Sequence, residues 1–304
     1  MEKGVVITGP TGAVGMALIQ KCIQEQCPTL LICHRGSKRN TYIPKSPNVR
    51  ILEYNLEELD KLQTEELGSY EVFYHLAWMG SYGEGRNDMM LQVENIAGTL
   101  KAVELAVRLG CTTFVGTGSQ AEYGRVDGVL SPKTPAKPEN GYGIAKLCAG
   151  QMSRELCRQH KVKHIWARLL SVYGPYDREE TMVQSSLRKM LDGKEVLLTP
   201  GEQLWEYLYS GDAAEMLWRL AQNGEDGRIY CLGSGQTARL RDYVEIMRQE
   251  TKTKSEIKIG ALPYREGQVM RLQADLSATT KATGYIPDTE FAQGIRNTIE
   301  WMKQ

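Results

Sequence analysis

Two side chains spaced four residues apart could carry acid–base chemistry. Tyr142 and Lys146 stand in the segment Tyr-Gly-Ile-Ala-Lys, so on a helix they would share one face. A free phenol has a pKa of about 10, and a cationic neighbour lowers it by stabilising the phenolate. Tyr142 could then exchange a proton at neutral pH. An amphipathic helix also produces this spacing by chance, so the pair indicates catalysis only together with further motifs.

A serine upstream of the pair is the first of these further motifs. Ser119 lies in the segment Gly-Thr-Gly-Ser-Gln-Ala-Glu-Tyr-Gly at 116–124, directly after an apolar run. Its hydroxyl could hold a substrate carbonyl or hydroxyl oxygen, and the glycines would let the loop approach closely. The simpler interpretation is a serine in an ordinary turn. With Tyr142 and Lys146, Ser119 forms a candidate catalytic set.

A glycine-rich turn opens the chain. Gly9, Gly12 and Gly15 stand in Gly-Pro-Thr-Gly-Ala-Val-Gly, between the first apolar run and a helical pattern. Such a turn presents bare backbone N–H groups to a pyrophosphate at a helix N-terminus. The spacing GxxGxxG only partly matches the common GxGxxG fingerprint, and an ordinary strand–helix turn is the alternative. Its position after the first strand favours a dinucleotide site.

The end of the second apolar run indicates which dinucleotide. An NAD site usually carries an acidic residue about 20 positions on, which holds the ribose 2′-hydroxyl. Here residues 33–39 read Cys-His-Arg-Gly-Ser-Lys-Arg, with no acid and three basic residues. Arginine can bind a 2′-phosphate bidentately. The loop therefore favours NADP, with NAD possible and a solvated basic loop as the alternative.

The elements around these motifs alternate between apolar, β-branched runs and helical patterns. This alternation predicts an α/β fold, a Rossmann-type doubly wound parallel sheet. The expected strands are Gly4–Thr8, Thr29–Cys33, Val49–Tyr54, Glu71–His75, Thr112–Gly116 and His164–Leu170. The expected helices are Gly12–Gln26, Arg86–Leu109, Tyr142–His160, Glu180–Leu191, Asp212–Gln222, Arg239–Gln249 and Phe291–Trp301.

The pattern changes after about Gly174, where helices alternate with short, irregular strand candidates. We expect a cofactor-binding domain over 1–173 and a smaller C-terminal α/β substrate domain over 174–304. The segment near 210–232 could return to the first domain. No internal repeat or low-complexity segment is present.

Composition excludes several partners. The 304 residues contain 37 Lys+Arg and 37 Asp+Glu, a formal net charge of zero. Because the positive and negative charges are equal in number, the composition indicates no basic surface for nucleic acid or an anionic membrane. Hydrophobic residues make up 41%, which is typical of a globular chain. No apolar stretch approaches the length of a membrane span, and no signal peptide is evident.

The seven cysteines are scattered without a CxxC pair, which fits a reducing compartment, so we expect a cytoplasmic protein. His160 and His164 are four residues apart, but lysines flank both and no third ligand is near. We expect no metal site.

Together these motifs resemble the extended short-chain dehydrogenase/reductases, and more narrowly the NAD(P)-dependent epimerase/dehydratase family acting on nucleotide sugars. The resemblance rests on the glycine turn, the Ser–Tyr–Lys set, Asn95 and the segment from Arg168 to Pro175. The late segments 205–212 and 265–271 and the terminal Gly-Tyr-Ile-Pro-Asp-Thr-Glu-Phe extend it from residue 4 to the end.

The resemblance implies roles for individual residues. Tyr142 would be the catalytic acid/base, Lys146 would bind the nicotinamide ribose, and Ser119 would hold the reacting sugar oxygen. The implied cofactor contacts, including those of the two predicted loops, are Gly9, Thr11, Gly12, Ala13, Val14, Gly15, His34, Arg35, Ser37, Arg39, Asn55, Leu56, Leu76, Ala77, Trp78, Asn95, Thr117, Tyr142, Lys146, Leu169 and Val172. The implied substrate contacts are Trp78, Ser119, Gln120, Ala121, Ser171, Trp205 and Arg271.

Departures from the family pattern narrow the reaction. Sugar 4,6-dehydratases carry an Asp-Glu pair directly after the serine or threonine, where this chain has Gln120 and Ala121. Enzymes that epimerise C3 and C5 carry a cysteine in that loop and a histidine after Tyr-Gly-Pro, where this chain has Tyr176. Trp205 stands where an arginine commonly contacts the nucleotide, and could stack on a base. Both dehydration and C3/C5 epimerisation are disfavoured.

The sequence therefore predicts hydride transfer at a ring carbon, C4, of a nucleotide-diphosphate sugar, by a 4-keto-sugar reductase or a 4-epimerase. The basic loop tilts the prediction toward a reductase. Alternatives are a non-sugar ketone reductase of the same fold, against which Arg265 and Arg271 speak, and a catalytically inactive NADP-sensing protein. The family resemblance also implies a homodimer that pairs the helices predicted at Arg86–Leu109 and Tyr142–His160.

Overall fold

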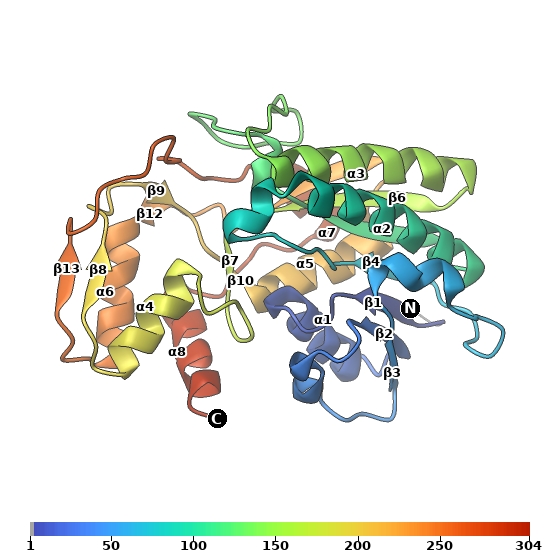
Figure 1. Cartoon of the computed structure of the whole chain (residues 1–304), viewed down its shortest axis with the longest axis horizontal. Helices are drawn as coiled ribbons and strands as arrows, with labels where there is room; N and C mark the ends of the chain where they lie inside the picture. Colours follow the sequence, from blue (N-terminus) through green and yellow to red (C-terminus); the bar gives the residue numbers. More distant parts are fainter. Residues whose placement is uncertain (1–2) are drawn as a thin grey trace.

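The computed structural model describes residues 3–304 and has a seven-stranded parallel sheet at its centre (Figure 1). The strands lie in the order β11-β6-β5-β4-β1-β2-β3, and every neighbouring pair is parallel. Their bounds are β1 Val5–Thr8, β2 Thr29–Cys33, β3 Val49–Glu53, β4 Val72–His75, β5 Thr113–Ser119, β6 Lys163–Leu169 and β11 Arg228–Leu232. The predicted doubly wound α/β fold is confirmed. The six predicted strands are present, and β5 runs on to Ser119.

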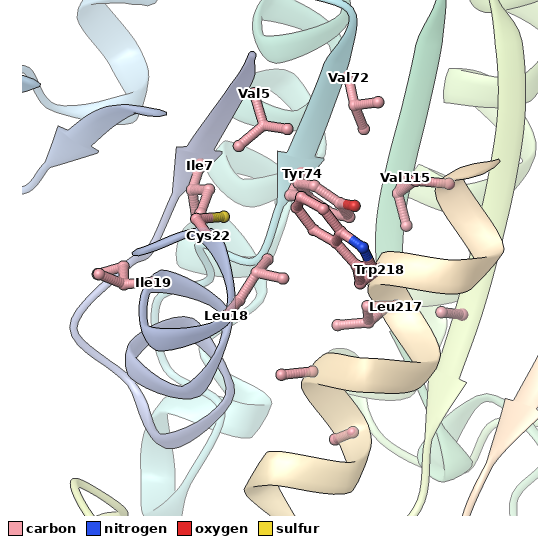
Figure 2. Packing of buried hydrophobic residues seen from close by; sticks show 14 of the residues in the cluster. Val5, Ile7, Leu18, Ile19, Cys22, Val72, Tyr74, Val115, Leu217 and Trp218 are labelled. Atoms are coloured by element: carbon pink, nitrogen blue, oxygen red, sulfur yellow. The ribbon is translucent and has the colours of Figure 1, made fainter. Parts of the chain in front are cut away.

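Helices cover both faces of the sheet, because successive strand residues point to opposite faces. Val5 and Ile7 of β1 pack into one apolar cluster with α1 (Ala13–Gln24) and α5 (Ser210–Asn223). Val6 belongs to the opposite cluster, beneath α2 (Met89–Arg108) and near α3 (Gly141–Gln159). Figure 2 shows the first of these clusters, with α1 and α5 supplying side chains from two sides.

The two long helices begin at side-chain caps. The Asp88 carboxylate accepts the Leu91 N–H at 3.1 Å, so α2 starts three residues later than predicted. The Asn140 side chain accepts the Gly143 N–H at 2.9 Å and opens α3. Four 3₁₀ turns complete the first part of the fold: η1 Lys38–Tyr42, η2 Leu56–Lys61, η3 Gly83–Asn87 and η4 Gln120–Glu122.

A second lobe lies to one side of the sheet and holds most of the C-terminal part (Figure 1). Its helices are α4 Met182–Leu191, α6 Leu240–Thr251 and α8 Phe291–Met302, and they share an apolar cluster that includes Leu187, Met247 and Ile295. Three two-stranded sheets accompany them: β7 Val172–Tyr173 with β10 Leu208–Tyr209, β9 Leu204–Trp205 with β12 Ala238–Arg239, and β8 Val196–Leu198 with β13 Ile257–Ile259. The short helix α7, Ser277–Thr283, contacts α5 and β11.

Between residues 210 and 232 the chain leaves the second lobe and returns to the main sheet. After β10 the chain forms α5, which packs on α1, and then β11, which pairs with β6 at the edge of the main sheet. Leu217 of α5 is fully buried in the same cluster as Ile7. The second lobe is therefore built from two segments, before and after this return. Among residues 3–304 no helix is long and apolar enough to cross a membrane.

Candidate active site at the carboxyl edge of the sheet

The main cavity of the described chain, about 580 Å³, opens at the carboxyl ends of the parallel strands. This edge is where doubly wound sheets bind ligands, because the strand order reverses there and leaves a crevice. The lining residues follow β1 to β6 and the loop before α4. They include Gly9, Thr11, Gly12, Ala13, Val14, Gly15, His34, Arg39, Asn55, Leu56, Leu76, Ala77, Trp78, Thr117, Ser119, Tyr142, Lys146, Leu169 and Val172.

The glycine turn fits a pyrophosphate by its close packing. Gly9 has φ +68°, and a Cβ there would lie 2.5 Å from the Ala77 nitrogen. A Cβ on Gly15 would lie 2.5 Å from the Pro10 carbonyl oxygen. Gly12 is the N-cap of α1, and the first residues of α1, Ala13, Val14 and Gly15, line the cavity. The turn thus offers a cradle and a positive helix end for an anion.

The basic loop after β2 divides between the cavity and the surface. Arg39 lines the cavity, donates to the Tyr176 carbonyl oxygen across it, and has a buried Nε without a partner. Arg35 instead pairs with Glu58 at 3.1 Å and lies 5.7 Å from the Tyr54 ring. Ser37 accepts the Arg39 N–H at 3.3 Å. Two of the predicted phosphate contacts, Arg35 and Ser37, thus do not line the cavity, because Arg35 is paired with Glu58 and Ser37 caps η1.

The three candidate catalytic residues meet at one end of the cavity. Ser119 ends β5, while Tyr142 and Lys146 stand on the first turns of α3, which packs against η4 and β5. The Ser119 side chain is close enough to Tyr142 to affect its pKa, and both residues line the cavity. The Lys146 ammonium donates to the Thr117 carbonyl at 2.7 Å and lies 3.8 Å from the centre of the Trp78 ring.

Electrostatics at this end differ from the sequence expectation. Burial raises the pKa of Tyr142, against the lowering effect of the Ser119 side chain and of the Arg86 and Arg178 charges. Burial also lowers the pKa of Lys146 to about 7, although the Glu122 charge opposes this shift. Lys146 points to Thr117 and Trp78, and the groups that lower the pKa of Tyr142 against burial are Ser119, Arg86 and Arg178.

Asn95, expected to line the cofactor, is fully buried in α2 and lies behind the cavity wall. Its Oδ1 accepts the Met79 N–H at 2.8 Å, and its Nδ2 donates to the Met79 carbonyl at 2.9 Å and to the Leu91 carbonyl at 3.0 Å. Met79 follows Trp78 on the cavity wall. Asn95 therefore fixes the loop after β4 and does not itself reach the cavity.

Most of the expected substrate contacts stand away from the cavity. Trp78 and Ser119 line it, whereas the following residues do not: Gln120, Ala121, Ser171, Trp205 and Arg271. Trp205 packs against the apolar cluster around Tyr123 and Leu272, in the second lobe's contact with the sheet. Arg271 donates to Gln273 Oε1 at 3.1 Å, and its buried Nε has no partner. The sequence motifs that contain Trp205 and Arg271 did not predict these packing and hydrogen-bond partners.

The loop between β7 and α4 contributes cavity residues that the sequence motifs did not predict. Asp177, Arg178 and Thr181 line the cavity, as does Tyr176, a non-glycine residue with φ +62°. Burial raises the pKa of Asp177 to about 6, while its bond from the Thr181 hydroxyl at 2.9 Å works against that shift. The charged run Tyr-Asp-Arg-Glu-Glu after a turn signal was the available clue.

A buried ion pair supports the serine loop. Glu122 is fully buried and Arg168 is 2% exposed, and the Arg168 Nε donates to Glu122 Oε2 at 2.6 Å. The other carboxylate oxygen accepts the Ser119 N–H at 2.8 Å and the Trp166 Nε1–H at 3.0 Å. One carboxylate therefore joins β5, β6 and η4 directly beneath the candidate catalytic serine.

Glu122→Gln should destabilise the fold by about 3–5 kcal/mol, because it leaves the Arg168 charge buried without a counterion. Urea unfolding, compared with wild type, measures the change. Glu139→Gln is the matched control, since Glu139 pairs with Arg125 at the surface and should cost less than about 1 kcal/mol. Equal effects of the two substitutions would contradict the assigned importance of the buried pair.

Comparisons with known proteins point to one family. The model of the NAD dependent epimerase/dehydratase family matches residues 5–233. CDP-abequose synthase from Salmonella muenchen is 23% identical over 304 residues, covering 98% of this chain and 98% of that protein.

Solved structures agree on the fold. UDP-glucose 4-epimerase from Thermotoga maritima, with UDP-glucose, has a TM-score of 0.88 and 20% identity, covering 99% of this chain and 98% of that chain. The dTDP-glucose 4,6-dehydratase of Streptomyces venezuelae, with NAD and TYD bound, has a TM-score of 0.86 and 20% identity. It covers 98% of this chain and 96% of its own.

Proposed function

Because the chain belongs to the NAD dependent epimerase/dehydratase family, we propose that it transfers hydride at C4 of a nucleotide-linked hexose. It is an enzyme of the extended short-chain dehydrogenase/reductase type. The observation that carries the proposal is the meeting of Ser119, Tyr142 and Lys146 in one cavity with the glycine turn. A nicotinamide dinucleotide fits that turn, because Gly12 lines the cavity and a Cβ there would meet no protein atom closer than 4.0 Å, which leaves space for a pyrophosphate.

The residues divide the work of a reduction between them. When bound, the cofactor supplies the hydride. Ser119 would hold the 4-keto oxygen of the sugar, and Tyr142 would give that oxygen a proton. Lys146 would hold the nicotinamide ribose from the Thr117 side of the cavity. Run in the opposite direction, the same set would oxidise C4, and a 4-epimerase would use both directions in one turnover.

We favour the 4-keto-sugar reductase over the 4-epimerase, on account of the basic loop. Dehydration is disfavoured by the loop after Ser119, where Gln120 and Ala121 offer no carboxylate. The next acid, Glu122, is held by Arg168 and stands outside the cavity wall. Arg178 and Asp177 supply charged groups at the cavity and fit a polar, phosphorylated substrate better than a simple ketone.

Turnover distinguishes these reactions. With a 4-keto-6-deoxy nucleotide sugar, a reductase should consume NADPH stoichiometrically, seen as loss of its near-ultraviolet absorbance. Tyr142→Phe should lower the rate by about 10²–10⁴-fold, since it removes the proton donor. Conversion of a nucleotide sugar without net cofactor change would favour the epimerase, and full activity of Tyr142→Phe would overturn the assigned proton transfer.

We also propose a preference for NADP, supported by Arg39. This arginine lines the cavity with an unpartnered, buried Nε, beside His34 and near the end of β2. A 2′-phosphate on the adenosine ribose would supply the missing acceptor. Arg35 is already paired with Glu58, so it is the weaker candidate for that contact.

Arg39→Met should raise the dissociation constant for NADPH by about tenfold or more and leave that for NADH nearly unchanged, because only NADPH carries the extra phosphate. Isothermal titration with both cofactors measures this. Arg35→Met is the matched control and should change neither constant by more than about twofold. If Arg39→Met weakened both cofactors equally, the preference would not arise at Arg39.

For the architecture we propose that residues 1–173, with the returning segment near 210–232, bind the cofactor, and that the remaining C-terminal lobe binds the nucleotide sugar. For assembly we propose a homodimer through α2 and α3, which lie side by side (Figure 1). Their outer faces expose large apolar side chains: Met89, Met90, Val93, Ile144 and Met152. A second copy would cover them.

Val93→Asp combined with Ile144→Asp should convert the dimer to monomer, because charges would then lie within an apolar interface. Sedimentation equilibrium gives the mass. The control pair Leu197→Asp and Leu262→Asp alters two exposed leucines, one in β8 and one just after β13, remote from α2 and α3, and should leave the mass unchanged. A monomeric wild type would refute the assembly.

A further inference from the structure

One cation lies directly against the ring of the candidate acid/base. The Arg86 guanidinium carbon is 4.5 Å from the centre of the Tyr142 ring. Its Nη1 donates to the Ser81 carbonyl at 3.1 Å, which fixes the side chain within the loop of η3. Arg86 does not itself line the main cavity, so it reaches the reaction only through Tyr142.

The chain holds this arrangement in place before any ligand binds. The Gly141 N–H donates to Asn87 Oδ1 at 3.1 Å, which ties the start of α3 to the end of η3. A Cβ on Gly141 would lie 2.9 Å from the Arg86 carbonyl oxygen, so glycine permits the close approach. Arg86 and Tyr142 are therefore neighbours by backbone packing, and not by a flexible side-chain contact alone.

Other charged groups near Tyr142 are differently placed. Glu122 lies on η4 and opposes formation of a phenolate, while Arg178, on the loop before α4, favours it. Lys146 is one turn along α3, but its ammonium is bound by the Thr117 carbonyl and covered by Trp78. Arg86 is the cation that the structure places over the face of the phenol ring.

A cation over an aromatic face is attracted by the ring electrons, and the attraction grows when the ring carries negative charge. Arginine keeps its proton at any working pH, so its contribution does not switch off. The effect on Tyr142 has the expected sign, since the Arg86 charge lowers the pKa of the phenol, against the larger effect of burial.

We propose that Arg86 is a positioning residue for the reaction, which stabilises the phenolate of Tyr142 through its charge over the ring. The proposal rests on the proposed role of Tyr142 as acid/base. It adds Arg86 to the electrostatic support that the sequence pattern assigns to Lys146, which would also hold the ribose.

The test observes the phenol itself and needs no sugar substrate. Protein labelled with 3-fluorotyrosine, saturated with NADP⁺, is titrated by ¹⁹F NMR. Among the signals of the 15 tyrosines, that of Tyr142 is identified by its loss in Tyr142→Phe. Arg86→Met should move the midpoint of this signal upward by about one pH unit. Arg86→Lys, which keeps a cation at the site, should move it by less than half as much.

Matched measurements separate charge from structure. Arg125→Met removes a surface arginine that pairs with Glu139 and should leave the midpoint unchanged. An unchanged midpoint in Arg86→Met would overturn the proposal. Equal shifts in Arg86→Met and Arg86→Lys would also overturn it, because loss of the bond to Ser81, and not loss of charge, would then be the cause. Absence of sugar turnover would count against the proposed function but leave these midpoints informative.

Discussion

The buried carboxylate of Glu122 organises the reacting end of this molecule. It accepts hydrogen bonds from the Ser119 backbone on β5, from Trp166 and from Arg168 on β6. A charge in such a position is tolerated only when its oxygens are fully satisfied, and here each of them has partners. Because these bonds cross from η4 to two adjacent strands, the orientation of Ser119 follows from the packing of the sheet and not from the loop alone.

The zero net charge conceals a marked local arrangement of cations. Arg39 and Arg178 line the cavity, and Arg86 lies over the Tyr142 ring. Charges close to a bound ligand act over short distances, where salt screens them little, so their placement matters more than their sum. This suits a small phosphorylated ligand that is bound at several separate points.

Sequence patterns could predict the parts of the fold that depend on local periodicity. The continuous apolar runs at Val5–Thr8 and Thr29–Cys33 became strands buried on both faces, and the glycine turn lies at the helix end as expected. The segment from 210 to 232 was harder, because its return to β6 depends on a partner far away in the chain.

The candidate site was predictable where a motif names the residues, as it does for the serine loop and the Tyr142–Lys146 pair. Ser119, Tyr142 and Lys146 met in the cavity because β5 and α3 are adjacent. Trp205 and Arg271 do not line it, and no spacing rule reveals that Trp205 packs in the cluster around Tyr123 and that Arg271 donates to Gln273. The position of Arg86 over the Tyr142 ring could not be predicted from the sequence either, because it depends on the close approach of η3 to Gly141.

Tyr176 shows how both lobes contribute to the wall of the cavity. Its backbone has φ +62°, an uncommon conformation for a side chain of this size, and its carbonyl receives the Arg39 guanidinium. Its ring lies 5.9 Å from that of Tyr42 on the cofactor side and 4.9 Å from that of Trp301 at the end of α8. One residue is thus held from both lobes at once. A shift of the C-terminal lobe would therefore move an acceptor of Arg39, the residue that we propose as the contact of the cofactor's 2′-phosphate.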